Sequence, residues 1–467
     1  MHLNSGSTRV TTISDETVRA FAKAVRGVVL RPGDKDYDGA RRVFNAMIDR
    51  RPALILRCGG AGDVVRGIDF ARSQDLPLAI RGGGHSVAGS AVCEGGLMLD
   101  LSGMKGVRID PLERTAVAEP GLTLAEFDCA TQAHGLATTL GVVSVTGIAG
   151  LTLGGGLGWL NGKHGLACDN LLAAQVATAD GQVLTASATE NEDLLWGLRG
   201  GGGNFGVVTS FTYRLHPLGT VLAGGVTFAP ERARDAMRFY HEFASTSPDE
   251  LSTAASLSLG EDGRPVFSVG VCWSGSLSSG ERVLRPLRSF GPPMADSIGP
   301  MDYCTLQSGK DAGFPHGRQH YWKASFLRDL SDDAIDVVLS AVARMPSPFS
   351  GVGLQQMCGV ASRVDPSATA FAHRARQYDF LILSQWDDPA ETSRNVAWTR
   401  ELFAAMEPFA EQSVYANNLG EEGDERVKAA YGVNYERLAA LKAKHDPTNM
   451  FGLNQNIKPS PSRRGLG

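Results

Sequence analysis

Apolar residues along the first 80 positions follow a helical period and then a strand period. Residues 15–25 carry apolar side chains on one helical face, and Ser14 precedes them as the N-cap. Residues 54–56 form a short apolar run, a helix with one apolar side opens at residues 61–63, and residues 76–80 form the next run. We expect a strand, a helix and a strand here, an order that is typical of a nucleotide-binding unit.

Similar patterns continue along the rest of the chain. Strands are predicted at residues 96–101, 115–118, 174–179, 207–215 and 378–386, and a further helix at residues 390–406. Thr123 and Glu126 form a capping box that opens another helix, which ends at Gly135. A chain of this length is too long for one core, so we expect two or more domains.

Glycine is concentrated in three clusters. The chain contains 56 glycines in 467 residues, and they gather at residues 81–89, 141–158 and 199–206. Without side chains, such loops bring backbone N–H groups close to a pyrophosphate or a flat ring. No cluster has the P-loop spacing. A classical Rossmann turn follows a strong strand, and no strong strand precedes residues 154–158. We interpret the clusters as loops that converge on one long ligand, although residues 81–89 alone are also compatible with a structural turn.

Composition and charge narrow the classes of partner. Charged residues make up 20% of the chain, the formal net charge is −5, and there is no basic block, so nucleic acid and anionic membranes are not expected partners. No apolar run reaches the roughly 18 residues of a membrane span. The N-terminal residues Met1–Gly6 lack a secretion signal, and the 7 scattered cysteines fit a reducing compartment. We expect a cytoplasmic protein that acts on a small molecule without a metal, while its oligomeric state is not readable.

Five motifs resemble those of one flavoprotein family. In order they read RGGGHSVAG (81–89), GGGLG (154–158), HGLACDN (164–170), LRGGGGNFGVVT (198–209) and NYERLAALKAKHDPTNMFGLNQNIKP (434–459). Together they resemble the berberine-bridge-enzyme-like FAD-linked oxidases of the vanillyl-alcohol-oxidase, or PCMH-type, superfamily. The resemblance extends from about residue 40 to residue 460.

The resemblance implies an α+β fold with two lobes. Residues 1–219 would form a PCMH-type FAD-binding domain, and residues 220–410 a substrate-binding domain with an antiparallel sheet covered by helices. Residues 411–467 would return to the FAD-binding domain. The active site would then lie between the sheet and the flavin ring.

The resemblance also implies a covalent cofactor. His85 matches the histidine that binds the 8α-methyl of the flavin, and Val143 stands where doubly linked members carry a cysteine. We therefore expect FAD attached through His85 only. Cys168 lies in a different motif, and we interpret it as a small buried residue.

Further cofactor contacts are implied by position. The implied FAD-binding residues are Arg81, Gly82, Gly83, Gly84, His85, Ser86, Gly89, Gly141, Val142, Val143, Thr146, Gly147, Gly150, Gly154, Gly156, Leu157, His164, Asn204, Phe205, Gly206, Val208, Tyr415, Asn454 and Asn456. For Asn454 and Asn456, a polar turn is the alternative. Thr146 matches the position that controls oxygen access, where valine goes with oxidases. Because threonine has the shape of valine, an oxidase is favoured.

The sequence offers several candidates for the residue that accepts the substrate proton. Many members use the last tyrosine of a Y-x-N-Y motif, but here Tyr415 begins the motif and Asn418 ends it. An amide does not accept a proton at neutral pH, so another base is needed. Asp379 is one candidate, because along its strand it shares a face with two leucines and Gln385 and could have a raised pKa. Its alternative is a solvated aspartate at a strand end.

Tyr321 is a second candidate, and its neighbour His320 could be a base or a substrate contact. Tyr415 is expected to contact the flavin or the substrate, and for His320 and Tyr415 a structural role is the alternative. The leading hypothesis is an oxidase that moves hydride from a CH–OH or CH–NH group of a glycoside, alkaloid or polyketide to flavin N5, with O2 reduced to H2O2. A dehydrogenase with another acceptor, and a flavin-binding protein without turnover, are the alternatives.

Overall fold

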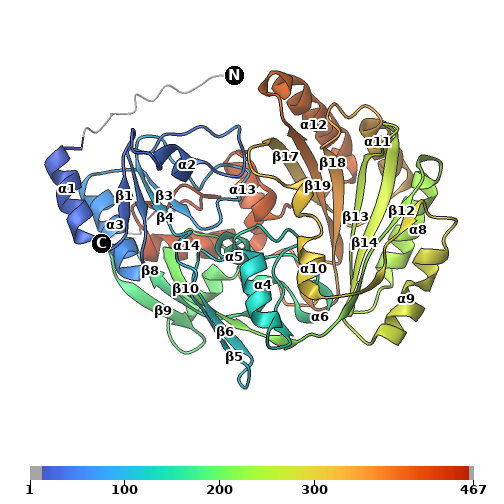
Figure 1. Cartoon of the computed structure of the whole chain (residues 1–467), viewed down its shortest axis with the longest axis horizontal. Helices are drawn as coiled ribbons and strands as arrows, with labels where there is room; N and C mark the ends of the chain where they lie inside the picture. Colours follow the sequence, from blue (N-terminus) through green and yellow to red (C-terminus); the bar gives the residue numbers. More distant parts are fainter. Residues whose placement is uncertain (1–12, 462–467) are drawn as a thin grey trace.

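The computed structural model describes residues 13–461, so the stretch Met1–Gly6, in which no secretion signal is expected, lies outside the described residues. Three of its sheets have four or more strands, and they fall into two groups that lie side by side (Figure 1). No helix within the described part combines the length and the apolar content needed to cross a membrane.

The first sheet has four strands and carries the first glycine cluster. Its order is β1 (Val28–Leu30), β2 (Leu54–Arg57), β4 (Leu97–Asp100), β3 (Leu78–Arg81). Strands β2 and β3 both run parallel to β4, as a β2–α3–β3 unit with α3 (Ala61–Ser73) requires. The predicted strand–helix–strand order is confirmed. Helix α1 (Asp15–Ala24) begins after Ser14, whose side chain caps it as expected.

The second sheet has five antiparallel strands. Its order is β5 (Val107–Asp110), β6 (Thr115–Ala118), β10 (Val207–Arg214), β8 (Leu171–Ala177), β9 (Val183–Ser187). The predicted capping box of Thr123 and Glu126 is present and opens α4 (Leu124–Gln132). A small ribbon pairs β7 (Leu136–Ala137) with β11 (His216–Pro217). Buried apolar side chains of this sheet pack with helices α7 (Glu192–Leu198) and α14 (Tyr435–His445).

The third sheet is antiparallel and has eight strands. Along it lie β15 (Ala295–Asp296), β12 (Val221–Phe228), β14 (Pro265–Trp273), β13 (Leu251–Leu259), β18 (Gly351–Met357), β19 (Gln377–Trp386) and β17 (Gln319–Leu327), while β16 (Gly299–Met301) also pairs with β12. Four helices cover one face: α8 (Ala233–Ser245), α9 (Leu277–Ser289), α11 (Asp332–Val342) and α12 (Thr392–Met406). The helix predicted at residues 390–406 begins two residues later, because Pro389 opens a short 3₁₀ turn before it.

Alternation along β19 separates the two faces of this sheet. Tyr378, Phe380 and Ile382 join the core beneath the helices. The residues between them, which begin with Asp379 and Leu381, point to the opposite face. That face is turned toward the glycine clusters.

The C-terminal segment returns to the first two sheets. Helix α13 (Asp424–Tyr431) leads into α14, where Lys442 forms a fully buried ion pair with Asp446 at 2.6 Å. The Lys442 ammonium also donates to the carbonyl oxygens of Asn204 (2.8 Å) and Phe451 (3.0 Å). These bonds join the tail to the third glycine cluster. The remaining short helices are α2 (Tyr37–Arg41), α5 (Ile148–Leu153), α6 (Asn161–His164) and α10 (Tyr303–Ser308).

Candidate active site

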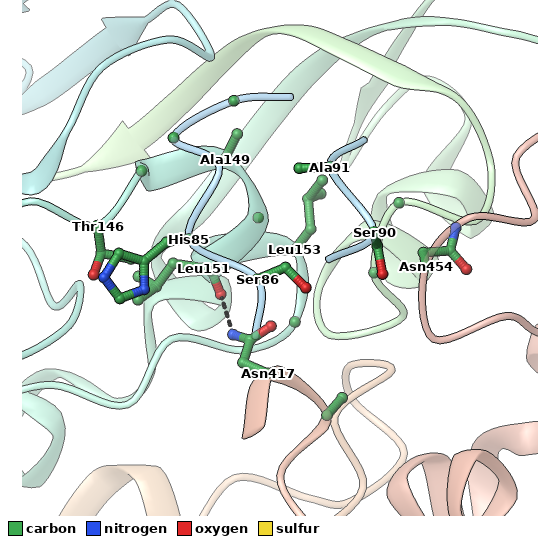
Figure 2. Close-up of a pocket in the computed structure, with 18 of the residues that line it drawn as sticks. His85, Ser86, Ser90, Ala91, Thr146, Ala149, Leu151, Leu153, Asn417 and Asn454 are labelled. Carbon is green, nitrogen blue, oxygen red and sulfur yellow. Dashed lines mark hydrogen bonds between the residues drawn. The ribbon is translucent and has the colours of Figure 1, made fainter. Parts of the chain in front are cut away.

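A cavity of about 380 Å³ lies between the glycine clusters and the uncovered face of the eight-stranded sheet. All three clusters line it, together with strands β17–β19 and the C-terminal segment. In Figure 2, His85 and Thr146 lie toward one end and Ser90 and Asn454 toward the other. The cavity is therefore elongated, with the histidine at one end.

The first two glycine clusters meet at the histidine end. A Cβ atom on Gly83 would stand 2.5 Å from the backbone nitrogen of Gly147, and a Cβ on Gly147 would stand 2.5 Å from that of Gly83. Neither contact has a flexible side chain that could give way, so both positions require glycine. At Gly89 the φ angle is +71°, which also favours glycine. The first cluster is thus shaped by close backbone packing as well as by the cavity.

His85 has an unusual environment for a histidine. Its ring stacks on Phe44 with a centroid distance of 3.9 Å, and its Nε2 is buried with no hydrogen-bond partner among residues 13–461. Burial, together with the nearby His316 imidazole, lowers the pKa of His85 to about 4. The imidazole is therefore neutral at physiological pH, and its lone pair is available to a ligand.

Tyr415 supports the second glycine cluster. Its hydroxyl oxygen accepts hydrogen bonds from the backbone N–H groups of Gly156 (2.8 Å) and Leu157 (3.3 Å), and from the side chain of Asn417 (2.7 Å). The same Asn417 amide donates to the carbonyl of Leu151, as Figure 2 shows. Burial raises the pKa of Tyr415. A neutral hydroxyl that organises a loop fits this geometry better than a base.

The third glycine cluster is held by Asn204. Its carbonyl group accepts from Lys442, its Oδ1 accepts from the backbone N–H of Ile457 (3.0 Å), and its amide donates to the carbonyl of Gln455 (3.2 Å). Asn204 thus fixes the tail against the cavity without lining it. Asn454 lines the cavity, and its Oδ1 has no hydrogen-bond partner in the described part of the chain.

Asp379 lines the cavity from the uncovered face of the eight-stranded sheet. It is buried, its Oδ2 accepts a hydrogen bond of 2.6 Å from the Asn418 amide, and its Oδ1 has no hydrogen-bond partner among the described residues. Burial raises the pKa of Asp379 to about 7, although the Asn418 hydrogen bond acts in the opposite direction. Asn418, which replaces the motif tyrosine, is therefore the partner of the carboxylate.

The other candidate bases lie elsewhere. The Tyr321 hydroxyl accepts from Arg400 of α12 (3.1 Å), so its side chain lies on the helix-covered face and does not line the cavity. His320 is buried behind Phe44, with a centroid distance of 4.2 Å, and does not line the cavity either. Burial and the His85 imidazole lower the pKa of His320 to about 3. The geometry therefore leaves Asp379 as the candidate base.

Most of the cofactor residues expected from sequence line the cavity. Those that line it are Gly82, Gly83, Gly84, His85, Ser86, Gly141, Val142, Val143, Thr146, Gly147, Gly150, Gly154, Leu157, Gly206, Val208, Tyr415 and Asn454. Seven others stand outside the lining: Arg81, Gly89, Gly156, His164, Asn204, Phe205 and Asn456.

Several of the residues outside the lining have identifiable structural contacts. His164 stacks on His216 at 3.8 Å, Phe205 is in the core of the second sheet, and Gly156 donates to Tyr415. Cys168 is fully buried outside the cavity, and burial raises its pKa. Its thiol is not positioned as a second attachment point.

The uncovered face of the eight-stranded sheet forms one wall of the cavity. Trp322, Leu381, Leu383 and Gln355 line the cavity beside Asp379, and Phe314 adds a loop residue. Trp322 and Leu383 pair across β17 and β19, and Gln355 pairs with Asp379 across β18 and β19. The face shared by Asp379 and Leu381 was readable from alternation, but the neighbouring strands could not be assigned without the register.

The cavity fits the FAD that the resemblance implies. Glycine backbones line it where a flat ring or a phosphate would need close approach, and the unpartnered Nε2 of His85 and Oδ1 of Asn454 are buried polar atoms of its lining. Unsatisfied buried polar atoms cost free energy unless a ligand meets them. His85, the three glycine clusters and the tail would hold such a ligand along its length.

Comparison with known proteins gives independent matches. The family described as FAD binding domain matches residues 52–187, and that described as Berberine and berberine like matches residues 411–458. An FAD-linked oxidoreductase of Dictyostelium discoideum is 31% identical over 449 residues, which cover 95% of this chain and 97% of that protein. The (R)-6-hydroxynicotine oxidase of Paenarthrobacter nicotinovorans is 31% identical over 450 residues, which cover 94% and 98%.

A solved structure shares the whole architecture. The crystal structure of 6-hydroxy-D-nicotine oxidase from Arthrobacter nicotinovorans matches with a TM-score of 0.86 at 29% identity, covering 93% of this chain and 98% of that one. The likeness therefore extends over nearly the whole of both chains.

Proposed function

Since the chain belongs to the berberine-bridge-enzyme-like FAD-linked oxidoreductases, we propose that it is an oxidase that takes two electrons from a CH–NH or CH–OH group of a small molecule and reduces O2 to H2O2. The observation that carries this proposal is the buried carboxylate of Asp379, which faces the same cavity as His85 and the glycine clusters. Residues 1–219 with 411–467 would hold FAD, and residues 220–410 would supply the substrate wall.

Residues that line the cavity would attach the cofactor, support its loops and accept the substrate proton. His85 would form the only covalent link, because Val143 stands at the second position and Cys168 lies outside the cavity. When bound, FAD supplies a hydride acceptor at its N5 atom. Tyr415 and Asn417 would keep the second glycine cluster in place. Asp379 would accept the substrate proton on Oδ1, while Asn418 holds Oδ2 and so fixes the plane of the carboxylate.

The cavity wall formed by strands β17–β19 favours a substrate with an amine on an apolar ring over a sugar. Trp322, Phe314, Leu381 and Leu383 offer few partners for hydroxyl groups, whereas a ring packs well against them. Asp379 is the one carboxylate that lines the cavity within residues 13–461, and no lysine or arginine of that range lines it. A protonated amine would pair with this carboxylate and then transfer its proton to it. The similarity to an enzyme named 6-hydroxynicotine oxidase accords with this choice.

The proposed electron acceptor rests on Thr146. Thr146 lines the cavity near His85, and the residue at this position controls oxygen access in the family. Its size resembles that of valine, which supports O2 as the acceptor. A dehydrogenase with another acceptor is the second candidate, because a threonine hydroxyl adds polarity where valine has a methyl group.

A substrate panel tests the proposed function. Anaerobic mixing of the holoprotein with an arylalkyl cyclic amine should bleach the flavin absorbance, and admission of O2 should restore it with release of one H2O2 per turnover. Cellobiose at the same concentration should leave the spectrum unchanged. Bleaching by cellobiose alone would favour a CH–OH substrate, slow reoxidation would favour the dehydrogenase, and bleaching by no compound would favour a flavin-binding protein without turnover.

The pH dependence of turnover should report Asp379. Because its pKa is raised to about 7, the carboxylate form is lost as the pH falls below 7, and kcat/KM should fall about tenfold per pH unit there. The other titratable groups of the lining do not ionise near pH 7, since burial lowers the pKa of His85 to about 4 and raises the pKa values of Tyr415 and Tyr431. Asn418→Leu removes the hydrogen bond that favours the carboxylate, so its acidic limb should move to higher pH. An unchanged limb in this variant would contradict the assignment.

A further inference from the structure

Phe44 lies at the centre of an aromatic stack that no sequence motif marks. Its ring is fully buried between the imidazoles of His85, at 3.9 Å and an interplanar angle of 16°, and His320, at 4.2 Å and 25°. His316 approaches the same ring edge-on at 5.8 Å. One face of the His85 ring is therefore covered by Phe44, which fixes the plane of the imidazole.

The backbone around Phe44 is bonded to the loop that carries His85. The Phe44 N–H donates to the carbonyl of Gly84 at 3.0 Å, immediately before the histidine. The buried Asn45 side chain donates to the carbonyl of Val87 at 2.8 Å, two residues after it. These two hydrogen bonds bracket His85, so the loop cannot rotate without breaking one of them.

The same segment is bonded to the substrate sheet. The Asn45 amide also donates to the carbonyl of His320 (3.0 Å), and its Oδ1 accepts from the His320 N–H (3.0 Å). The Ala46 N–H donates to the carbonyl of Arg318 at 3.0 Å. Phe44 further packs with Trp322 of the cavity wall, at a centroid distance of 6.2 Å. Residues 44–46 thus connect the histidine loop to strand β17.

We infer that Phe44 and Asn45 form a clamp that holds the His85 imidazole in the orientation needed for covalent attachment to FAD. The clamp also fixes the position of the His85 loop relative to strand β17 of the substrate wall. This inference rests on the proposed attachment through His85. Phe44 and Asn45 are positioning residues, because neither lines the cavity. The low pKa of His85 agrees with the clamp, since the stacked rings exclude water from the imidazole.

The coupling that the clamp would serve is chemically balanced. The imidazole N–H bond and one C–H bond of the 8α-methyl group are replaced by an N–C bond. The two electrons and two protons released go to O2, which becomes H2O2. The protein would contribute the neutral imidazole of His85 with its unpartnered Nε2, and a small misorientation is expected to slow such a step markedly.

Phe44→Leu tests the clamp by removing the stacked ring while keeping an apolar side chain. The flavin that stays with the polypeptide after acid precipitation is measured per mole of purified holoprotein. We expect the wild type to keep its flavin, and Phe44→Leu to release most of it in acid, with coupling slowed on the order of tenfold. Phe44→Tyr keeps the ring and should restore the covalent fraction.

A matched control comes from another stack in the same chain. Phe21 stacks on Phe70 with a centroid distance of 4.0 Å and an interplanar angle of 16°, and neither ring lines the cavity, so Phe21→Leu should retain its covalent flavin. A wild-type covalent fraction in Phe44→Leu, an equal loss in Phe21→Leu, or failure of Phe44→Leu to bind FAD at all would each overturn the clamp. If the wild type itself releases FAD in acid, the proposed covalent link fails instead.

Discussion

Replacing His85 by alanine should eliminate acid-stable flavin from the protein completely. Among residues 13–461, His85 is the one histidine that lines the cavity, no cysteine lines it, and Val143 cannot react. FAD should still bind, since the glycine clusters and the tail remain. The measurement is the flavin absorbance of the acid pellet and of the supernatant, with the total flavin taken before precipitation.

The control for this variant is a histidine in a similar state away from the cavity. His445 has a buried Nε2 without a hydrogen-bond partner in the described chain, and burial lowers its pKa, but it does not line the cavity. His445→Ala should therefore keep its flavin in the pellet. Acid-stable flavin in His85→Ala would point to a different attachment residue, and the single-link proposal would be lost.

Much of the architecture was predictable because it depends on local patterns and ordered motifs. The capping box at Thr123 and the N-cap at Ser14 act within one turn, and the structure contains both. The two-lobed α+β fold with a helix-covered antiparallel sheet is confirmed, and it agrees with the solved relative. Alternation along β19 placed Asp379 and Leu381 on one face, which is the face that lines the cavity.

The rest of the site depends on contacts between distant segments. Tyr321 and His320 are neighbours in sequence, yet one meets α12 and the other meets Phe44, because successive strand residues point to opposite faces. Phe44 reaches His85 only through the packing of residues 44–46 against β17, and Trp322 joins the wall through the pairing of β17 with β19. No local pattern specifies that packing, so the clamp and the wall required the structure.

Asp379→Asn should lower kcat/KM by about 10²–10⁴, the usual contribution of a positioned base. Asparagine keeps the size of the side chain but cannot accept a proton at neutral pH. Flavin binding and the covalent fraction should not change, because His85 and the loops are untouched. The measurement is kcat/KM at pH 8, where the wild-type carboxylate is largely ionised. Activity within a few-fold of the wild type would show that another group accepts the proton.

Asp128 provides the matched control for this experiment. It too is a fully buried carboxyl group with one amide donor, Gln307 at 2.8 Å, and burial raises its pKa to about 7, yet it lies outside the cavity. In both residues the folded-state pKa is above the unfolded value, so stability is lost as the pH rises from about 4 through 7. Each asparagine variant should therefore be at least as stable as the wild type at pH 8. Only Asp379→Asn should lose turnover, and this contrast would separate a carboxylate kept for catalysis from one that is merely buried.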